Sequence, residues 1–226
     1  MKRRLMTLLA MTLTISLITA YGNLILPIKG NSEQHPANSM WIEPSIIDIS
    51  GMSVGDRFNV TVWVNVTVDC AGWQFAMLYD TRYLNATRAG YTGSDGTRSQ
   101  FFEQSGTVSM MPLTPTLYNP YNETHNYVLH GEVWSPMIPG NPYATGTGSL
   151  SWIEFQIIAE PPFTTTLDIE TLYPAKTYIA DSASNKIELN LYNVEVVPEF
   201  PSSWILLLLL TISFFITTLI AKKKNK

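Results

Sequence analysis

Residues 58–68 read FNVTVWVNVTV, a run in which apolar side chains occupy every second position. A period of two is typical of a β-strand with one buried face and one wet face. The predicted buried residues are Phe58, Val60, Val62, Val64, Val66 and Val68, and the opposite face carries Asn59, Thr61, Trp63, Asn65 and Thr67. The run therefore predicts a strand that packs on one side only, as strands of a β-sandwich do.

The same alternation returns along the chain as far as residue 196. The further inward-facing sets are Trp73, Phe75, Met77 and Tyr79; Ile153, Phe155 and Ile157; Leu167 and Ile169; Ile187, Leu189 and Leu191; and Val194 with Val196. Gly, Pro, Asn and Asp separate these runs, and no sustained helical stripe occurs between the two chain ends. A further strand is expected near residues 127–134, between long loops. The predicted fold class is all-β, a sandwich of two sheets.

The two ends of the chain predict membrane targeting. Lys2, Arg3 and Arg4 precede an apolar run at 5–20, which is the pattern of a secretory signal peptide. Retention of residues 5–28 as a second spanning helix is the alternative. Near the other end, the largely apolar residues 204–221 would extend roughly 27 Å as a helix, which matches one hydrocarbon core.

The expected organisation is a signal peptide (1–22), a linker (23–40), a β-sandwich (41–197), a Pro-rich juxtamembrane spacer (198–203), a transmembrane helix (204–221) and a basic cytoplasmic tail (222–226). The lysines of the tail favour the cytoplasmic side, because positively charged segments resist translocation. The predicted location is the cell membrane, with a single C-terminal anchor and an extracellular ectodomain.

The charge balance of the predicted domain excludes one class of partner. Residues 41–197 carry 16 Asp and Glu against 6 Lys and Arg, a net charge of −10. A domain with so few cations does not bind nucleic acid through its phosphates. Cys70 is the only cysteine of the chain, so no disulfide can form within it, and we expect a small buried hydrophobe there.

The motifs of catalysis are missing from the sequence. It contains no metal-ligand spacing of His, Cys and Asp, no nucleophile elbow and no phosphate-binding loop. Paired carboxylates stay open, since Asp80, Asp95, Glu103 and Glu132 lie near turns, but nothing selects two of them. We predict a protein that is not an enzyme and that requires no metal or cofactor.

Two sets of residues are candidates for surface functions. Four Asn-Xaa-Thr sequons, at Asn59, Asn65, Asn85 and Asn122, are predicted glycosylation sites, with placement by strand chemistry alone as the alternative. The candidate ligand-face aromatics are Tyr118, Tyr121, Trp134 and Tyr143 in the Pro- and Asn-rich stretch 112–143, and Trp63 and Trp152 on predicted outer strand faces. The loop aromatics either form a binding platform or pack the loops against the sheets.

Four segments of the chain, in order, resemble cohesin domains. They are residues 54–62 (VGDRFNVTV), 71–80 (AGWQFAMLYD) with Leu84 following, 146–157 (GTGSLSWIEFQI) and 193–196 (NVEV). Thr81 stands where the cohesin turn has proline. The resemblance covers about residues 42–197, and it implies a jelly-roll sandwich of about nine strands. It also implies a non-catalytic module that binds dockerin modules through one sheet face.

Residues that follow the predicted domain have a likeness of their own. Pro198, Glu199 and Phe200, with the apolar segment and lysines after them, resemble the PEF-type sorting signals of archaeal surface proteins. This resemblance implies cleavage near the motif and transfer of the protein to a lipid. The alternative is that Pro198 and Pro201 form a stiff spacer.

Three functions follow from these observations. The leading one is a surface-anchored recognition module whose partner is a dockerin-like protein module. The second is a polysaccharide-binding module, in which planar aromatic rings stack on sugars. The third is a structural envelope or adhesion protein.

Overall fold

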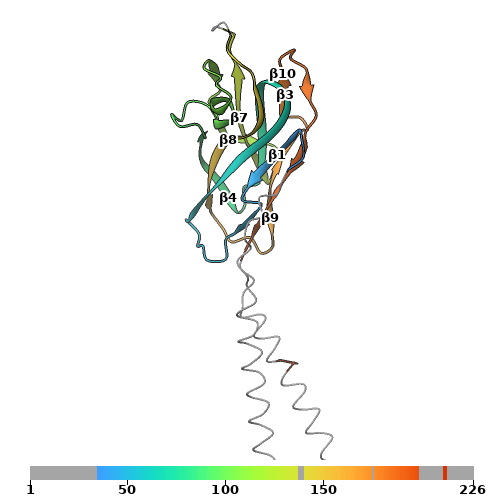
Figure 1. The fold of residues 1–226 in the computed structure, drawn as a ribbon. Coiled ribbons are helices and arrows are strands. Elements are labelled where there is room, and N and C mark those ends of the chain that lie inside the picture. The colour runs from blue at the N-terminus through green and yellow to red at the C-terminus, as the bar shows by residue number, and fades with distance from the viewer. Residues whose placement is uncertain (1–34, 137–139, 175, 199–210, 213–226) are drawn as a thin grey trace, which may run out of the picture. The chain divides into compact units, whose positions relative to one another are not determined.

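The computed structural model describes residues 35–136, 140–174, 176–198 and 211–212, and it places thirteen strands and one short helix among them (Figure 1). The elements are β1 (Ser39–Glu43), β2 (Ile46–Asp48), β3 (Arg57–Asp80), β4 (Leu84–Tyr91), α2 (Gln100–Gln104), β5 (Met110–Pro112), β6 (Thr116–Pro120), β7 (His125–Trp134), β8 (Ala144–Ile157), β9 (Thr165–Ile169), β10 (Tyr178–Asp181), β11 (Lys186–Ile187), β12 (Asn190–Tyr192) and β13 (Val194–Val197). The predicted all-β sandwich is confirmed, but the prediction of about nine strands is wrong. The surplus consists of strands of two or three residues, too short to show an alternation in the sequence.

One long strand, β3, belongs to both sheets of the sandwich. Its first half pairs with β1 and β8, and its second half pairs with β7, β9 and β10. The register shifts between Val66 and Cys70, where the ribbon bends over in Figure 1. Strands that change sheets at such a bend form the corners of sandwiches. The runs at 58–68 and 72–79, predicted as two strands, are therefore one.

The two sheets follow from these pairings. Sheet one has the order β12–β1–β3–β8–β4, and it contains the first half of β3. Sheet two contains the second half of β3, with β7 and then β5 and β6 on one side. On the other side lie β10, which continues to β11, and β9, which continues to β13 and β2. The core is the space between the two sheets.

Most of the predicted inward-facing residues line this core. Buried members include Val60, Val62, Val64 and Val66 from β3, Trp73, Phe75, Met77 and Tyr79 beyond its bend, and Ile153, Phe155 and Ile157 from β8. Val68 is an exception, since it lies in the bend and is exposed. Cys70 is buried as predicted, and burial raises the pKa of its thiol to about 12.

Two local predictions are corrected by the structure. The set Ile187, Leu189 and Leu191 does not belong to one strand, because β11 pairs with β10 and β12 pairs with β1. A helix, α2, also occurs where none is predicted. It spans only five residues, too few for a helical repeat to show, yet it buries Phe101 and Phe102 and is capped by Ser99.

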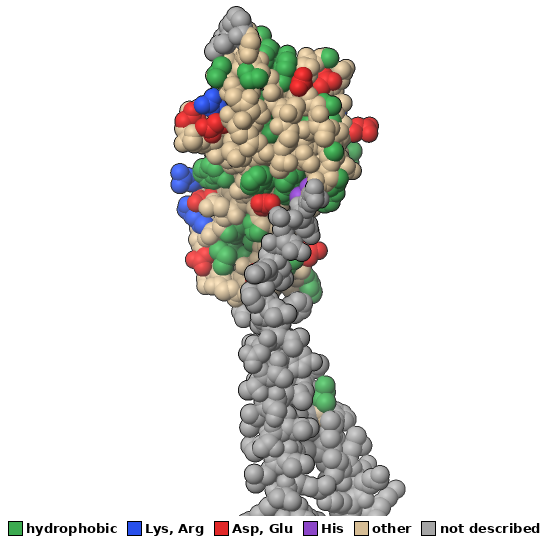
Figure 2. All heavy atoms as spheres, viewed as in Figure 1, with side chains coloured by type: hydrophobic (Ala, Val, Ile, Leu, Met, Phe, Trp, Pro, Cys, Tyr) green, Lys and Arg blue, Asp and Glu red, His purple; other side chains and the backbone are tan. Residues whose placement is uncertain are grey.

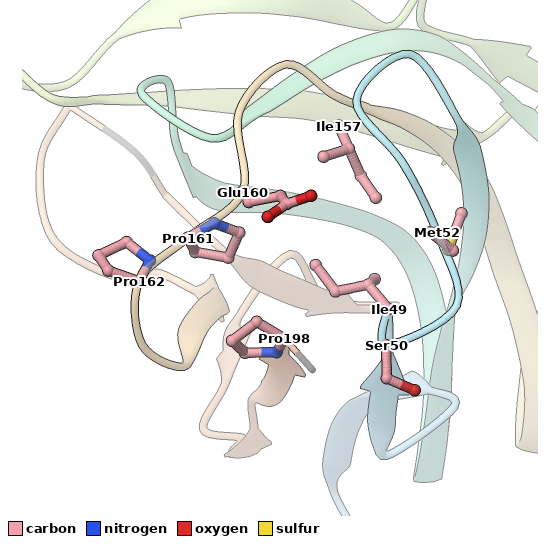
Figure 3. A pocket seen from close by; sticks show the side chains of 8 residues that line it. All are labelled: Ile49, Ser50, Met52, Ile157, Glu160, Pro161, Pro162 and Pro198. Atoms are coloured by element: carbon pink, nitrogen blue, oxygen red, sulfur yellow. The ribbon is translucent and has the colours of Figure 1, made fainter. Parts of the chain in front are cut away.

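Several predictions fall outside the described residues. These are the signal peptide, most of the linker, Glu199 and Phe200 of the sorting motif, the spacer beyond Pro198, the basic tail, and the spanning helix apart from residues 211–212. Among the described residues, no helix is both long and apolar enough to cross a bilayer. Pro198 is described, and Figure 3 shows it at a cavity of about 290 Å³ that is also lined by Ile49, Ile157, Pro161 and Pro162.

Candidate recognition face

Strand β7 places two polar side chains on its core side beside Val128. His130 and Glu132 point into the core, where both are almost completely buried. Leu129 and Val133 lie on the opposite side, away from the core, and Val133 is 39% exposed. Burial of a carboxyl beside outward-facing aliphatic residues runs against the hydrophobic effect. A strand of this kind needs an explanation on both of its faces.

The inward face holds Glu132 by two donors. Its Oε2 accepts hydrogen bonds from Trp73 Nε1 at 3.2 Å and from the backbone nitrogen of Ser99 at 3.0 Å, at the start of α2. Burial raises the pKa of Glu132 to about 7. Its second carboxyl oxygen is buried and has no hydrogen-bond partner among the described residues.

His130 lies two residues before Glu132, on the same inward face of β7. Its Nδ1 is 2.8 Å from Ser151 Oγ on β8, and its ring centroid is 4.3 Å from that of Tyr91. Burial lowers the pKa of His130 to about 4, so the imidazole is neutral at neutral pH. Through these contacts, His130 and Glu132 form a polar part of the core.

The outward face of β7 forms an apolar patch with the neighbouring chain. Met111 of β5 is directly opposite Val133, and Leu113 follows β5. Met111 is 48% and Leu113 is 43% exposed. A Cβ placed on Gly131 would meet Leu113 Cδ1 at 3.1 Å, so Leu113 lies over the glycine. Met111, Leu113 and Val133 are called the apolar patch from here on.

A second apolar cluster lies on the outer side of β3 and β7. Ala76, Leu78 and Tyr127 pack together there, with Tyr121 and Leu129 against them. Ala76, Leu78 and Tyr127 are buried, so the chain itself covers this cluster, whereas the residues of the apolar patch are exposed.

Sheet one carries the aromatic candidates Trp63 and Trp152 on its outer face. The Trp63 ring stacks on the Trp41 ring with centroids 6.2 Å apart. The His35 ring in turn stacks on the Trp41 ring with centroids 4.2 Å apart. Trp152 lies over Gly90, and the Arg88 guanidinium is 5.7 Å from its ring centroid. Both tryptophans are half-buried in these contacts. Figure 2 shows one face of the molecule, with hydrophobic side chains at its top, middle and lower part and with most of the charged side chains toward its left and right edges.

The four loop aromatics do not come together as a single platform. Trp134 and Tyr143 pair with ring centroids 4.5 Å apart at the end of β7, and Trp134 Nε1 donates to the carbonyl of Asn141. Tyr118 and Tyr121 lie near the start of β7, where the Tyr121 hydroxyl is 3.5 Å from Glu170 Oε2. Tyr118 is the exposed one of the four, at 60%.

Three of the candidate carboxylates each contact a different partner. Asp80 pairs with Arg82 at 2.6 Å, Asp95 accepts from Thr97, and Glu103 accepts from Ser94. Within the described ranges, no group of three or more His, Cys, Asp or Glu side chains is placed to hold a metal ion.

The four sequons occupy two kinds of site. Asn59 and Asn65 lie on β3 and Asn85 lies on β4, all within paired strands. Asn122 lies in the turn between β6 and β7. Asn59 and Asn122 are exposed, and Asn65 and Asn85 are half-buried.

The described residues form a β-sandwich with an exposed apolar patch on the outer side of sheet two. Solved structures similar to this chain are cohesin modules, the family that the sequence motifs resemble. A type II cohesin from Bacteroides cellulosolvens is 18% identical, with a TM-score of 0.49, and the match covers 73% of this chain and 100% of that one. A non-cellulosomal cohesin from the archaeon Archaeoglobus fulgidus is 14% identical, with a TM-score of 0.44, over 71% of this chain and 90% of that one.

A third similar structure is a type I cohesin–dockerin complex from Clostridium thermocellum. It is 15% identical, with a TM-score of 0.46, and the match covers 72% of this chain and 100% of that one. No family model matches the chain, and no curated protein matches it.

Proposed function

We propose that the chain is a non-catalytic recognition module that binds a partner protein module through the outer face of sheet two. The observation that carries this proposal is the arrangement of β7, which buries the polar side chains of His130 and Glu132 while Val133 faces outward. Keeping a carboxyl in the core costs free energy. A partner that covers the apolar patch would bind favourably, because it removes exposed apolar area from water.

The kind of partner is proposed from the sequence. The motifs at 54–62, 71–80 and 146–157 resemble cohesin motifs, and that resemblance favours a dockerin-like module. The exposed aliphatic side chains of the apolar patch suit contact with the apolar surface of a folded protein. We include surface anchoring in the proposal, because tethering would raise the local concentration of a captured partner.

The experiment that tests this function is a pull-down with the purified body, residues 35–198, from the secreted and surface fraction of the source cells. The proposal expects recovery of one or more proteins that share a common small module. Binding of such a module, expressed alone, must then be reproduced with purified components. Capture of polysaccharide alone, or of nothing, would contradict the proposal, and capture of nothing would favour an envelope or adhesion role.

Replacing Val133 with Asp should weaken binding of the captured module about a hundredfold, because it places a charge at the centre of a surface that the partner desolvates. Isothermal titration or biolayer interferometry measures the change. The matched control is Val54→Asp, because Val54 is exposed in the turn before β3 and receives the same charge elsewhere. Equal affinities of the two variants would place the partner on another surface.

A polysaccharide ligand is the second candidate, and one observation favours it. Trp41 and Trp63 form a stacked pair on the outer side of sheet one, and Trp152 lies on the same side, on the strand next to that of Trp63. Planar rings on a sheet face can stack on sugars. Loss of polysaccharide retention in Trp63→Ala, with retention kept in Val133→Asp, would support this candidate.

A further inference from the structure

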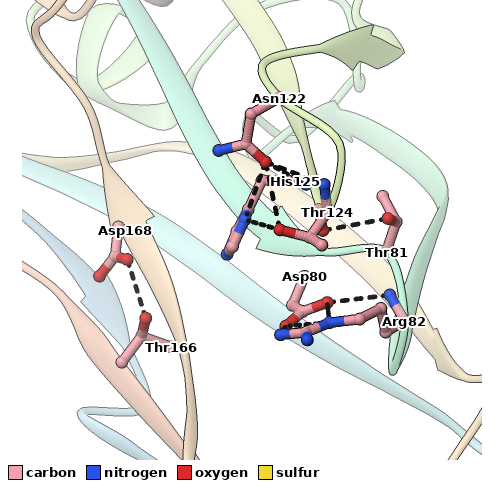
Figure 4. Close-up of polar contacts among 8 residues, drawn as sticks. All are labelled: Asp80, Thr81, Arg82, Asn122, Thr124, His125, Thr166 and Asp168. Atoms are coloured by element: carbon pink, nitrogen blue, oxygen red, sulfur yellow. Dashed lines mark hydrogen bonds and ion pairs between the residues drawn. The ribbon is translucent and has the colours of Figure 1, made fainter.

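The four sequons differ in what their side chains contact, and the geometry of one of them suits the acceptance of a sugar. Asn122 lies in the exposed turn between β6 and β7 (Figure 4). Its Oδ1 accepts hydrogen bonds from the backbone nitrogens of Thr124 and His125, both at 2.9 Å, and from Thr124 Oγ1 at 3.2 Å. The side-chain carbonyl is thereby held toward the turn, and Figure 4 shows Nδ2 directed away from these donors.

The threonine of this sequon is also held in place. Thr81, at the end of β3, donates to the carbonyl of Thr124 from its backbone nitrogen at 2.9 Å and from its hydroxyl at 3.0 Å. Thr124 Oγ1 lies 2.9 Å from His125 Nδ1 as well. The turn is therefore fixed against the body, so its geometry is present before any enzyme binds it.

The sequon at Asn65 has the opposite character. Asn65 Nδ2, the atom that would receive a sugar, donates to the backbone carbonyls of His35 and Pro36, each at 3.2 Å. Its threonine, Thr67, donates to Asn38 Oδ1 from both its backbone nitrogen and its hydroxyl. Modification of Asn65 would require all of these contacts to be released.

Asn59 and Asn85 are held by their backbones instead. Asn59 is opposite Glu154 and Asn85 is opposite Gln156 in the β8 ladder. Both lie inside strands whose neighbours fix an extended backbone, so neither can form the turn seen at Asn122 without opening the sheet.

We propose that Asn122 is the N-glycosylation site of the folded protein and that Asn65 is not modified. The donor would be a sugar linked through a phosphate ester to a polyprenol. In the transfer, Nδ2 of Asn122 forms a bond to the anomeric carbon and the bond from that carbon to the phosphate oxygen breaks. The lipid phosphate leaves with the electron pair, and Nδ2 gives one proton to a base of the transferase.

The proposed site is separate from the apolar patch. Eight positions along β7 separate His125, beside the turn, from Val133, which corresponds to roughly 26 Å of extended strand. A glycan on Asn122 would leave the patch open, so partner binding and glycosylation are tested independently.

The test uses the folded full-length chain in detergent, a purified oligosaccharyltransferase that accepts Asn-Xaa-Thr, and a polyprenyl-linked oligosaccharide. The enzyme preparation is one that modifies synthetic peptides spanning residues 117–127 and 61–70 equally. Glycopeptide mass spectrometry reports the occupancy of each sequon. We expect Asn122 to be modified at a rate about thirtyfold above Asn65, because two hydrogen bonds hold Asn65 Nδ2.

The variants sharpen this result. Asn122→Gln and Thr124→Val should abolish the added mass, Thr124→Ser should retain it, and Asn65→Gln should leave it unchanged. Similar rates at Asn65 and Asn122, or no transfer to Asn122 while the peptides react, would overturn the proposal. Capture of the protein partner by Asn122→Gln should equal that of the unmodified chain.

Discussion

Trp73→Ala should lower the free energy of unfolding by about 4 kcal/mol, among the largest single-residue effects in the domain. The indole is buried at the centre of the core, where it contacts Phe75, Tyr91 and His130. Its Nε1 also donates to Glu132, so its removal leaves a cavity and takes one of two donors from a buried carboxyl. Urea unfolding of residues 35–198, followed by fluorescence and circular dichroism, gives the change.

The matched control for Trp73 is Trp152→Ala. Trp152 is half-buried on the outer side of sheet one, and its side chain contacts Arg88 rather than the core. The expected loss is about 1 kcal/mol, the scale of an exposed cation–π contact with some apolar burial. A loss from Trp152→Ala as large as that from Trp73→Ala would contradict the assignment of the core.

The pH dependence of stability should have opposite signs in the two single variants Glu132→Gln and His130→Gln. Folded Glu132 has a pKa of about 7, above its ordinary value, so its contribution to stability is present below pH 4.5 and is lost as pH rises to 7. Folded His130 has a pKa of about 4, below its ordinary value, so its contribution is present above pH 6.5 and is lost as pH falls to 4. Burial causes both shifts, and the two slopes oppose each other.

Between pH 4.5 and 6.5 the two contributions nearly cancel in the unmodified protein. Glu132→Gln should leave only the histidine slope, so stability should rise with pH by up to about 1.4 kcal/mol per unit. His130→Gln should leave only the glutamate slope, so stability should fall with pH by a similar amount. The double variant should again be nearly flat. Parallel profiles for the two single variants would show that these groups do not titrate as their burial requires.

The core could be predicted from the sequence wherever one strand face is purely apolar. Alternation with outward-facing residues puts four valines on one face of β3, and that face is buried. They are Val60, Val62, Val64 and Val66. The bend at 66–70 could not be predicted, because the polar residue Asp69 and the glycine at 72 read as a break between strands. Its continuity depends on pairing with β8 and β7, which are distant in the sequence.

The candidate recognition face could not be predicted, although β7 itself could. Residues 128–133 read VLHGEV, and both of its faces carry one or more apolar residues. Alternation therefore does not decide which side enters the core. That choice depends on Trp73 and Ser99, which supply donors to Glu132 only once the fold has formed. The apolar patch, with Met111 and Leu113, was missed for the same reason.

The sequons could be located by their motif and the aromatic candidates by residue type. The environments of these side chains then distinguish one candidate from another. Asn65 and Asn122 are equivalent in the sequence, but only the structure shows that Asn65 Nδ2 donates to backbone carbonyls while Asn122 is held in its turn through Oδ1. Trp134 and Tyr143 pack against each other, which agrees with the alternative that loop aromatics hold loops in place.

The most direct test of the proposed recognition face is the affinity of the captured partner module for three forms of residues 35–198, measured by titration under one condition. The forms are the unmodified protein, Val133→Asp on sheet two and Trp152→Ala on sheet one. We expect that only Val133→Asp loses affinity, by about a hundredfold, while its unfolding curve stays unchanged. Loss of affinity in Trp152→Ala with full affinity in Val133→Asp would contradict the account and place recognition on the aromatic face of sheet one.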